Sequence, residues 1–183
     1  MTARFPFDDD SLDYIFSEHS IEHVDYESGQ NMSHECFRVL KPSGRVRIAT
    51  PDLEVLLALY RHEKTADQNH YLEWAGARFL PEISGCKDVF VINSFFRSWG
   101  HQFLYDKETL HYTLSQAGFR DLRTYRAGES DNPALEGLEA HGRELGSEEI
   151  NQFETLAIVL LCYKKPRKQQ GQRGRDLARC VAI

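Results

Sequence analysis

A short apolar stretch, Leu12 to Phe16, places the strongest constraint on how this chain can fold. A turn rich in proline and aspartate precedes it, and a polar cluster at residues 17–23 follows it directly. A buried strand of a parallel sheet has this pattern when it delivers functional groups at its carboxyl end. Ligands bind at those ends in open α/β sheets, so we expect the site at residues 17–23.

The rest of the chain alternates between strand and helix patterns. Apolar side chains at helical spacing predict helices, and aspartate before such a segment can cap it. Short apolar runs bounded by proline, glycine or polar residues predict strands. Strands are expected at 46–50, 122–125 and 154–163, and helices at 31–40, after Asp52 and after Asp106. This order of elements predicts an α/β fold.

Composition indicates one soluble domain. The chain has 183 residues, of which 41% are hydrophobic, enough to bury a substantial core. Its four cysteines form no C-x-x-C pair, so neither a zinc ribbon nor a disulfide framework is indicated. The N-terminus lacks the apolar core of a signal peptide, and the longest apolar run, Leu156 to Tyr163, is too short to span a bilayer. We expect a cytoplasmic protein with no membrane partner.

Charge divides the chain into an acidic body and a basic tail. Residues 164–183 hold seven of the 22 basic residues and a single acid, which leaves a net charge of −12 on residues 1–163. An acidic body argues against nucleic acid as the main partner. The tail is also rich in glutamine and glycine, a composition that predicts disorder. The predicted folded domain is therefore residues 1–163.

Two phrases of the sequence resemble one enzyme family. Residues 5–23 read FPFDDDSLDYIFSEHSIEH, and residues 35–52 read ECFRVLKPSGRVRIATPD. In this order and spacing they resemble the class I S-adenosylmethionine-dependent methyltransferases of the type 11 kind. The resemblance implies a Rossmann-like sheet with strands in the order 4-5-7-6, the last one antiparallel, and helices on both faces. It implies S-adenosylmethionine as cofactor, an oxygen or nitrogen of a small molecule as methyl acceptor, and residues 63–104 as an inserted cover.

The family's first three strands have no counterpart in this sequence. With them goes the Gly-rich loop that admits the cofactor, and none of the twelve glycines forms a G-x-G. We therefore expect an amino-terminally truncated enzyme, produced by a shortened gene, a misplaced start codon or degeneration. The alternative is a non-catalytic remnant that acts as a binding or assembly module. Either way the strand Leu12–Phe16 should be an unprotected sheet edge through which the chain self-associates.

The resemblance also assigns roles to individual residues. A base near neutral pH suits histidine, and His19 and His101 are the candidates. Further phrases of this chain, WGH-x-x-x-YD and G-E-S-D followed by LE-x-H, fit loops of a substrate site. The predicted cofactor-binding residues are Phe5, Phe7, Ser17, Glu18 and His19, and the predicted substrate-binding residues are Trp99, Tyr105, Glu129 and His141. Core packing is the competing interpretation for Phe5 and Phe7.

A second pattern overlaps the first. His19, Glu22 and His23 spell H-x-x-E-H, in which two histidines one helical turn apart hold zinc in the inverted zinc peptidases. A zinc hydrolase is therefore a second alternative function. The methyltransferase phrase accounts for the same residues and about thirty more, so the preferred interpretation assigns no metal site.

Overall fold

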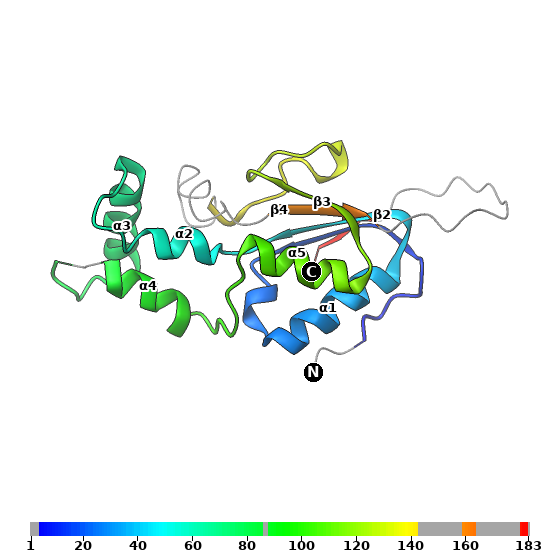
Figure 1. The fold of residues 1–183 in the computed structure, drawn as a ribbon, viewed down its shortest axis with the longest axis horizontal. Helices are drawn as coiled ribbons and strands as arrows, with labels where there is room; N and C mark the ends of the chain where they lie inside the picture. The colour runs from blue at the N-terminus through cyan, green and yellow to red at the C-terminus, as the bar shows by residue number, and fades with distance from the viewer. Residues whose placement is uncertain (1–3, 86–87, 143–158, 164–179, 183) are drawn as a thin grey trace.

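The computed structural model describes residues 4–85, 88–142, 159–163 and 180–182. Within this part of the chain, five strands form one sheet in the order β3-β4-β2-β1-β5 (Figure 1). β1 and β2 are parallel, whereas β4 is antiparallel to β2 and to β3. The strands are β1 (Leu12–Glu18), β2 (Leu40–Ala49), β3 (Arg120–Tyr125), β4 (Val159–Tyr163) and β5 (Cys180–Ala182).

The predicted α/β fold and its strand order are confirmed. The expected strands 4, 5, 7 and 6 are β1, β2, β4 and β3, and β4 is the antiparallel one. The predicted last strand at 154–163 is described only from Val159 onward, and its first five residues lie outside the described part. The parallel pairing aligns the carboxyl ends of β1 and β2, with Glu18 opposite Ala49. Polar groups that follow both strands therefore meet at one edge of the sheet.

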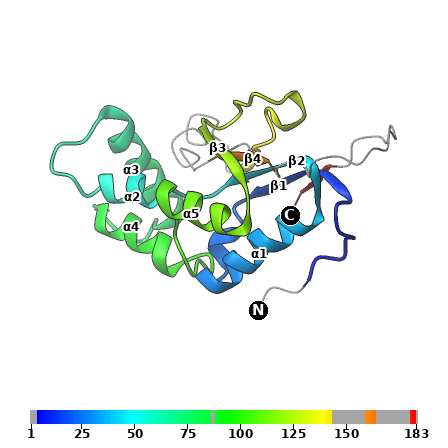
Figure 2. The same cartoon turned by 45° about the vertical axis from the view of Figure 1, so that its right-hand side comes forward.

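Two long helices cover one face of this sheet. α1 (Tyr26–Val39) and α5 (Lys107–Ala117) lie side by side beneath it in both views (Figures 1 and 2). α1 begins five residues earlier than the predicted helix, because the Asp25 carboxylate accepts a hydrogen bond of 2.7 Å from the backbone N–H of Ser28. The predicted cap of α5 by Asp106 is confirmed by the same type of bond to Thr109 (2.7 Å). Segment 126–142, with the short 3-10 helix η2 (Pro133–Leu135), crosses the opposite face.

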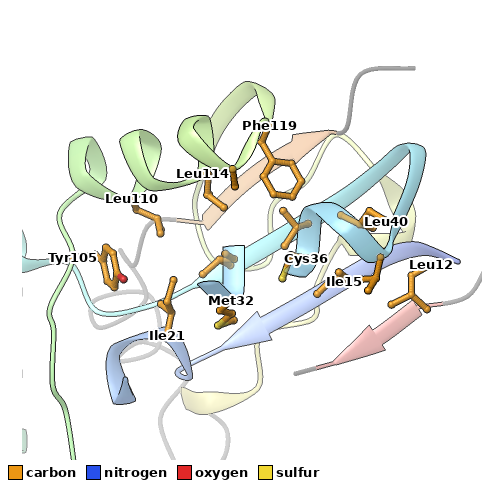
Figure 3. Packing of buried hydrophobic residues seen from close by; sticks show 14 residues of the cluster. Leu12, Ile15, Ile21, Met32, Cys36, Leu40, Tyr105, Leu110, Leu114 and Phe119 are labelled. Atoms are coloured by element: carbon orange, nitrogen blue, oxygen red, sulfur yellow. The ribbon is translucent and has the colours of Figure 1, made fainter. Parts of the chain in front are cut away.

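The main core lies between the sheet and these two helices (Figure 3). It includes Met32 and Cys36 of α1, Leu110 and Leu114 of α5, and Ile15 of β1. Burial raises the pKa of the Cys36 thiol to about 12, so the thiol stays protonated and acts as a small apolar side chain. The described residues 4–52, 105–142, 159–163 and 180–182 are called the sheet unit below.

A second group of helices extends beyond the carboxyl ends of β1 and β2 (Figures 1 and 2). It comprises α2 (Leu53–Ala58), α3 (Ala66–Phe79) and α4 (Asp88–Arg97), and residues 53–104 are called the helical unit. It has its own buried core, formed by Leu56, Leu59, Tyr71, Ala75, Val91, Ile92, Phe95 and Leu104. No helix within the described residues is long and apolar enough to cross a membrane.

The strand Leu12–Phe16 is not the sheet edge that the sequence predicted. β5 pairs with it in parallel, with Tyr14 opposite Cys180 and Phe16 opposite Ala182. The expectation of an open edge at β1 is therefore wrong, while self-association of the chain stays a prediction without the open edge that motivated it. Residues 180–182 at the end of the tail form β5, whereas 164–179 and 183 lie outside the described residues, so the predicted disorder of the tail stays a prediction. The basic composition of the tail hid its last residues, a short apolar sequence that suits a strand.

Candidate functional site

A cavity of about 210 Å³ opens where the sheet unit meets the helical unit. The ends of β1 and β2, the helical unit and the end of segment 126–142 each contribute to its wall. The wall combines imidazole rings with apolar and aromatic side chains, from His19, His23, Pro51, Phe79, Phe95, Trp99, His101 and His141. Few polar groups on an apolar surface are typical of small-molecule sites. The cavity also lies at the carboxyl end of β1, where the sequence predicted the site.

Two of the five described residues other than glycine that have a positive φ line this cavity. His19 has a φ of 47° and Trp99 a φ of 57°, a left-handed backbone conformation that residues other than glycine rarely adopt. The backbone N–H of His19 is held by the carbonyl of Ala49 at the end of β2, at 2.9 Å. Such strain costs about 1–3 kcal/mol per residue and tends to occur at functional sites. The turn at residue 19 places the imidazole at the mouth of the parallel strands.

A buried carboxylate lies directly behind His19. Oε1 of Glu22 is 3.1 Å from Nδ1 of His19, and Oε2 accepts a hydrogen bond of 2.9 Å from the Thr50 hydroxyl. The Glu22 side chain is completely buried. Burial by itself would raise the pKa of Glu22, but the His19 ring and the Thr50 hydroxyl outweigh it and lower that pKa below its usual range. Glu22 is therefore a carboxylate at neutral pH, and it fixes the Nδ1 side of His19.

The His141 ring stacks on His19, with ring centroids 3.9 Å apart and an interplanar angle of 28°. Burial and the neighbouring His19 lower the pKa of His141 to about 4, so His141 is neutral at pH 7. The Glu18 carboxylate positions it by accepting hydrogen bonds from the backbone N–H groups of Ala140 (3.0 Å) and His141 (3.1 Å). Glu18, a predicted cofactor-binding residue, thus holds the loop that carries His141.

His101 and His23 form a second pair of rings, with centroids 4.9 Å apart. Nδ1 of His101 lies 2.8 Å from the carbonyl of Phe95. A carbonyl can only accept, so this nitrogen carries the proton and Nε2 keeps its lone pair. Burial lowers the pKa of His101, which also keeps the ring neutral. Four histidines from separate parts of the chain therefore line one cavity.

The structure brings together some of the predicted site residues. His19, Trp99, His101 and His141 all line the cavity. Ser17 is buried at the end of β1 just before them, and its hydroxyl has no hydrogen-bond partner among the described residues. The sequence missed Glu22 as a partner of His19, because its position next to His23 was interpreted only as part of a zinc pattern. It also missed Phe79 and Phe95, for which helical spacing alone predicts core packing.

Phe5 and Phe7 lie elsewhere. Both pack against the main core, and the cavity wall does not include them. The Arg38 guanidinium donates hydrogen bonds to the carbonyls of Phe5 (3.2 Å) and Phe7 (2.9 Å), and Glu35 accepts from the N–H of Phe5 (2.7 Å). These bonds tie the amino-terminal segment to α1. Both phenylalanines pack as core residues do, and their predicted contact with the cofactor stays a prediction.

Two predicted substrate-binding residues are also away from the cavity wall. Tyr105 is fully buried in the main core, where its ring packs against Phe103 at a centroid distance of 4.8 Å. The absence of a side chain at Gly29 allows this close approach, because a Cβ there would clash with the Tyr105 hydroxyl. Glu129 is exposed, and its backbone carbonyl accepts a hydrogen bond from Arg47 at 2.8 Å. Neither residue reaches the cavity.

A buried ion pair gives a structural role to the two sequence phrases G-E-S-D (residues 128–131) and LE-x-H (residues 138–141). Nε of Arg47 on β2 is 2.6 Å from Oε1 of Glu139, and both side chains are essentially inaccessible. Oε2 of Glu139 also accepts the N–H of Gly128 at 2.9 Å. The pair fastens segment 126–142 across the sheet and so sets the position of His141.

The helix required by the zinc-peptidase pattern is not formed. Residues Ile21–His23 make a single 3-10 turn, and His19 lies outside it in a left-handed conformation. His19 and His23 therefore do not occupy one face of an α-helix. The structure instead brings Glu22 and His23 next to His101, with the ligand atoms of these three residues within 4.8 Å of one another.

A comparison with known protein families agrees with the methyltransferase resemblance of residues 5–23. Residues 1–48 match the family described as the methyltransferase domain. A search of the curated proteins returned no significant match. The match agrees with the resemblance of that part of the chain to the methyltransferases.

Solved structures of similar shape include several methyltransferases. One is an S-adenosylmethionine-dependent enzyme from Archaeoglobus fulgidus, with a TM-score of 0.47 and 17% identity, covering 86% of this chain and 62% of that one. A Thermotoga maritima enzyme, described as a possible histamine N-methyltransferase, gives 0.44 and 16%, with coverage of 88% and 60%. Haemonchus contortus phosphoethanolamine N-methyltransferase 2, in complex with S-adenosylmethionine, gives 0.40 and 14%, with coverage of 89% and 35%. The chain thus spans less than two thirds of the length of each.

Proposed function

We propose that this chain, whose first 48 residues match the methyltransferase domain family, serves the S-adenosylmethionine-dependent methylation of an oxygen or nitrogen of a small molecule. The carrying observation is the pair of His19 and buried Glu22, which lies beside a cavity of about 210 Å³ at the carboxyl end of β1. A cavity of this size suits a small acceptor or one end of a larger one.

Methyl transfer from a sulfonium depends on in-line placement of the acceptor and on removal of its proton. His19 is better arranged than His101 for the second task. Glu22 contacts Nδ1 of His19, so Nε2 is the basic atom of that ring, and the carboxylate stabilises the imidazolium that forms when it takes a proton. His101 has only a neutral carbonyl behind it. His19 is therefore the proposed base, and Glu22 is its positioning residue.

The aromatic wall would position the acceptor. Phe79, Phe95 and Trp99 present edges and faces of rings to the cavity, with Phe95 and Trp99 centroids 5.3 Å apart. Apolar walls exclude water from the transferred methyl group and strengthen the electrostatic contact of His19 with Glu22. Ser17 and His19 at the end of β1 are the proposed cofactor-binding groups among the described residues of the sheet unit.

The cofactor's methionine end needs a loop that the 183 residues do not contain. Glycine permits a close backbone approach to a ligand that other residues obstruct, and the sequence has no G-x-G. We expect calorimetry to give no S-adenosylmethionine binding to this chain in the micromolar range. The protein extended by the residues encoded directly upstream of Met1 should bind it if they supply such a loop. Micromolar binding by the 183 residues alone would contradict the loop argument.

The same extended protein tests the roles of the histidines. His19→Ala should lower turnover about a hundredfold, since positioned acid–base groups contribute about 10²–10⁴. Glu22→Gln should also lower kcat. The matched control is His70→Ala, which replaces an exposed histidine on α3. If neither form of the protein binds the cofactor, the chain is instead a non-catalytic binding or assembly module. Unchanged turnover in His19→Ala with a full loss in His101→Ala would move the base to His101.

A further inference from the structure

We propose that Glu22, His23 and His101 bind one divalent metal ion of the zinc class at the base of the cavity. Each residue offers one ligand atom, and these atoms lie within 4.8 Å of one another. Tetrahedral ligands about 2.1 Å from a metal are about 3.4 Å apart, so small side-chain rotations bring the three into range. Two imidazoles and one carboxylate are a ligand set that zinc accepts in catalytic sites.

The hydrogen bonds around these ligands already have the arrangement of a metal site. Metal-binding histidines donate their other ring N–H to a carbonyl or carboxylate, and ligating carboxylates are themselves hydrogen-bonded. His101 donates from Nδ1 to the Phe95 carbonyl at 2.8 Å, which leaves the lone pair on Nε2 for a metal. The Thr50 hydroxyl donates to Oε2 of Glu22 at 2.9 Å. Both ligands are therefore oriented before any ion binds.

The backbone also fixes the two segments against each other. The N–H of Gln102 donates to the carbonyl of Glu22 at 2.7 Å, and its side-chain amide donates to the carbonyl of His23, also at 2.7 Å. His101 thus sits beside Glu22 and His23 through bonds that do not involve any ligand atom. Gly100, with a φ of 80°, completes the turn that presents the His101 ring. A preformed backbone lowers the entropy cost of assembling a metal site.

The buried charge of Glu22 gives an independent reason to expect a cation. Its side chain is completely buried, and Oε1 makes no hydrogen bond of good geometry with any described residue although it lies 3.1 Å from the His19 ring. Buried charges in proteins are normally paired or coordinate metals. A divalent ion would neutralise the carboxylate and occupy the Oε1 side.

The proposed centre differs from the zinc-peptidase pattern. That pattern uses His19 and His23 on one helix, whereas here His101 from the end of the helical unit replaces His19. His23 and His101 both line the cavity, so a three-residue centre leaves a coordination position that a small molecule or water could fill. Glu22 can contact His19 and bind metal at once, because a carboxylate has about four lone-pair sites. The inference does not depend on methyl transfer.

Cobalt(II) is a suitable probe, because its visible absorption distinguishes four-coordinate from six-coordinate sites. The 183-residue chain is stripped with a chelator and titrated with CoCl2, followed by absorption and by calorimetry. We expect one equivalent to bind with an intense visible band typical of a four- or five-coordinate site, and one equivalent of Zn²⁺ to remove the band. Absence of that band, or binding of several equivalents at equal weak affinity, would overturn the proposal.

Variants identify the ligands. His23→Ala and His101→Ala should each weaken Co²⁺ binding at least tenfold and abolish the band, whereas His70→Ala on the exposed side of α3 should leave both unchanged. His23→Gln is prepared as well, so that a folded variant is available if the alanine variant fails by circular dichroism. Co²⁺ affinity in the His23 and His101 variants equal to that of the unaltered chain would show that the ion binds elsewhere. Since the readout is metal binding alone, it is independent of any result with S-adenosylmethionine.

Discussion

The sheet unit and the helical unit differ in what they contribute to the shared cavity. Buried polar and charged side chains of the described residues belong almost entirely to the sheet unit, including Ser17, Glu22, Arg47, Thr50 and Glu139. Ser94, in the helical unit, bonds only to the carbonyl of Val91 in its own helix, at 2.6 Å. The helical unit supplies aromatic rings instead. The fully buried charged side chains thus lie in the sheet unit, where hydrogen bonds hold them, while the helical unit contributes aromatic rings and His101 to the cavity wall.

The physical reason is the availability of hydrogen-bond partners. A buried carboxylate or guanidinium needs several partners at fixed positions, and the aligned ends of β1 and β2 supply backbone and side-chain groups for this purpose. A packed helix satisfies its own backbone and offers few free groups to a buried charge. Rings need only apolar contact, so helices can carry them.

The largest expected effect comes from the buried ion pair of the sheet unit. Arg47→Met leaves the Glu139 carboxylate buried without its partner at 2.6 Å, which should lower the free energy of unfolding by about 3–5 kcal/mol. The double variant Arg47→Met with Glu139→Leu should recover most of that loss, because both charges are then gone. Urea denaturation measures both values.

Arg45→Met is the matched control for this prediction. Arg45 lies on the same strand, and its ion pair with Asp131 (2.8 Å) is about one third exposed. Partly exposed pairs contribute about 0–1 kcal/mol, so a small change is expected. A loss in Arg45→Met as large as in Arg47→Met would contradict the difference that we assign to burial.

A substitution in the core of the helical unit should destabilise that unit more than the sheet unit. Leu59 is fully buried in the core of the helical unit, and Leu59→Ala should cost about 2–5 kcal/mol there. Because the two cores are distinct, hydrogen exchange should show lost protection in α3 and α4 while β1 and α1 keep theirs. Leu114→Ala in the main core is the comparison, and it should lower protection throughout. Equal loss in all elements after Leu59→Ala would show that the units unfold as one.

The smallest expected effect is self-association of the chain when β5 is removed from the edge of the sheet. A chain that ends at residue 179 lacks β5 and exposes the Tyr14–Phe16 backbone with which β5 pairs. An uncovered apolar edge pairs with other chains, so light scattering should show larger species as concentration rises. A chain that ends at residue 182 is the control and should behave as the full chain does. A monomeric 179-residue chain at high concentration would show that β5 is not what protects β1.

Residues close in sequence determined much of the fold. The apolar run after a Pro- and Asp-rich turn was enough to predict β1 and the polar groups behind it. Asp106 and Gly118 marked both ends of α5, since capping and a left-handed C-terminal residue act within one helical turn. The family phrases added the antiparallel β4 and the order of the strands. His19, the proposed base, was also identified at this level.

Tertiary structure alone decided which distant groups meet. His19 contacts Glu22 and stacks on His141, 122 positions later in the chain, and neither contact follows from local spacing. β5 reaches β1 from the other end of the chain, because an open strand edge pairs with whatever extended segment the fold brings beside it. Sequence patterns record which face of an element is buried. They do not record the partner that buries it, which depends on how the whole chain closes the sheet and packs its helices.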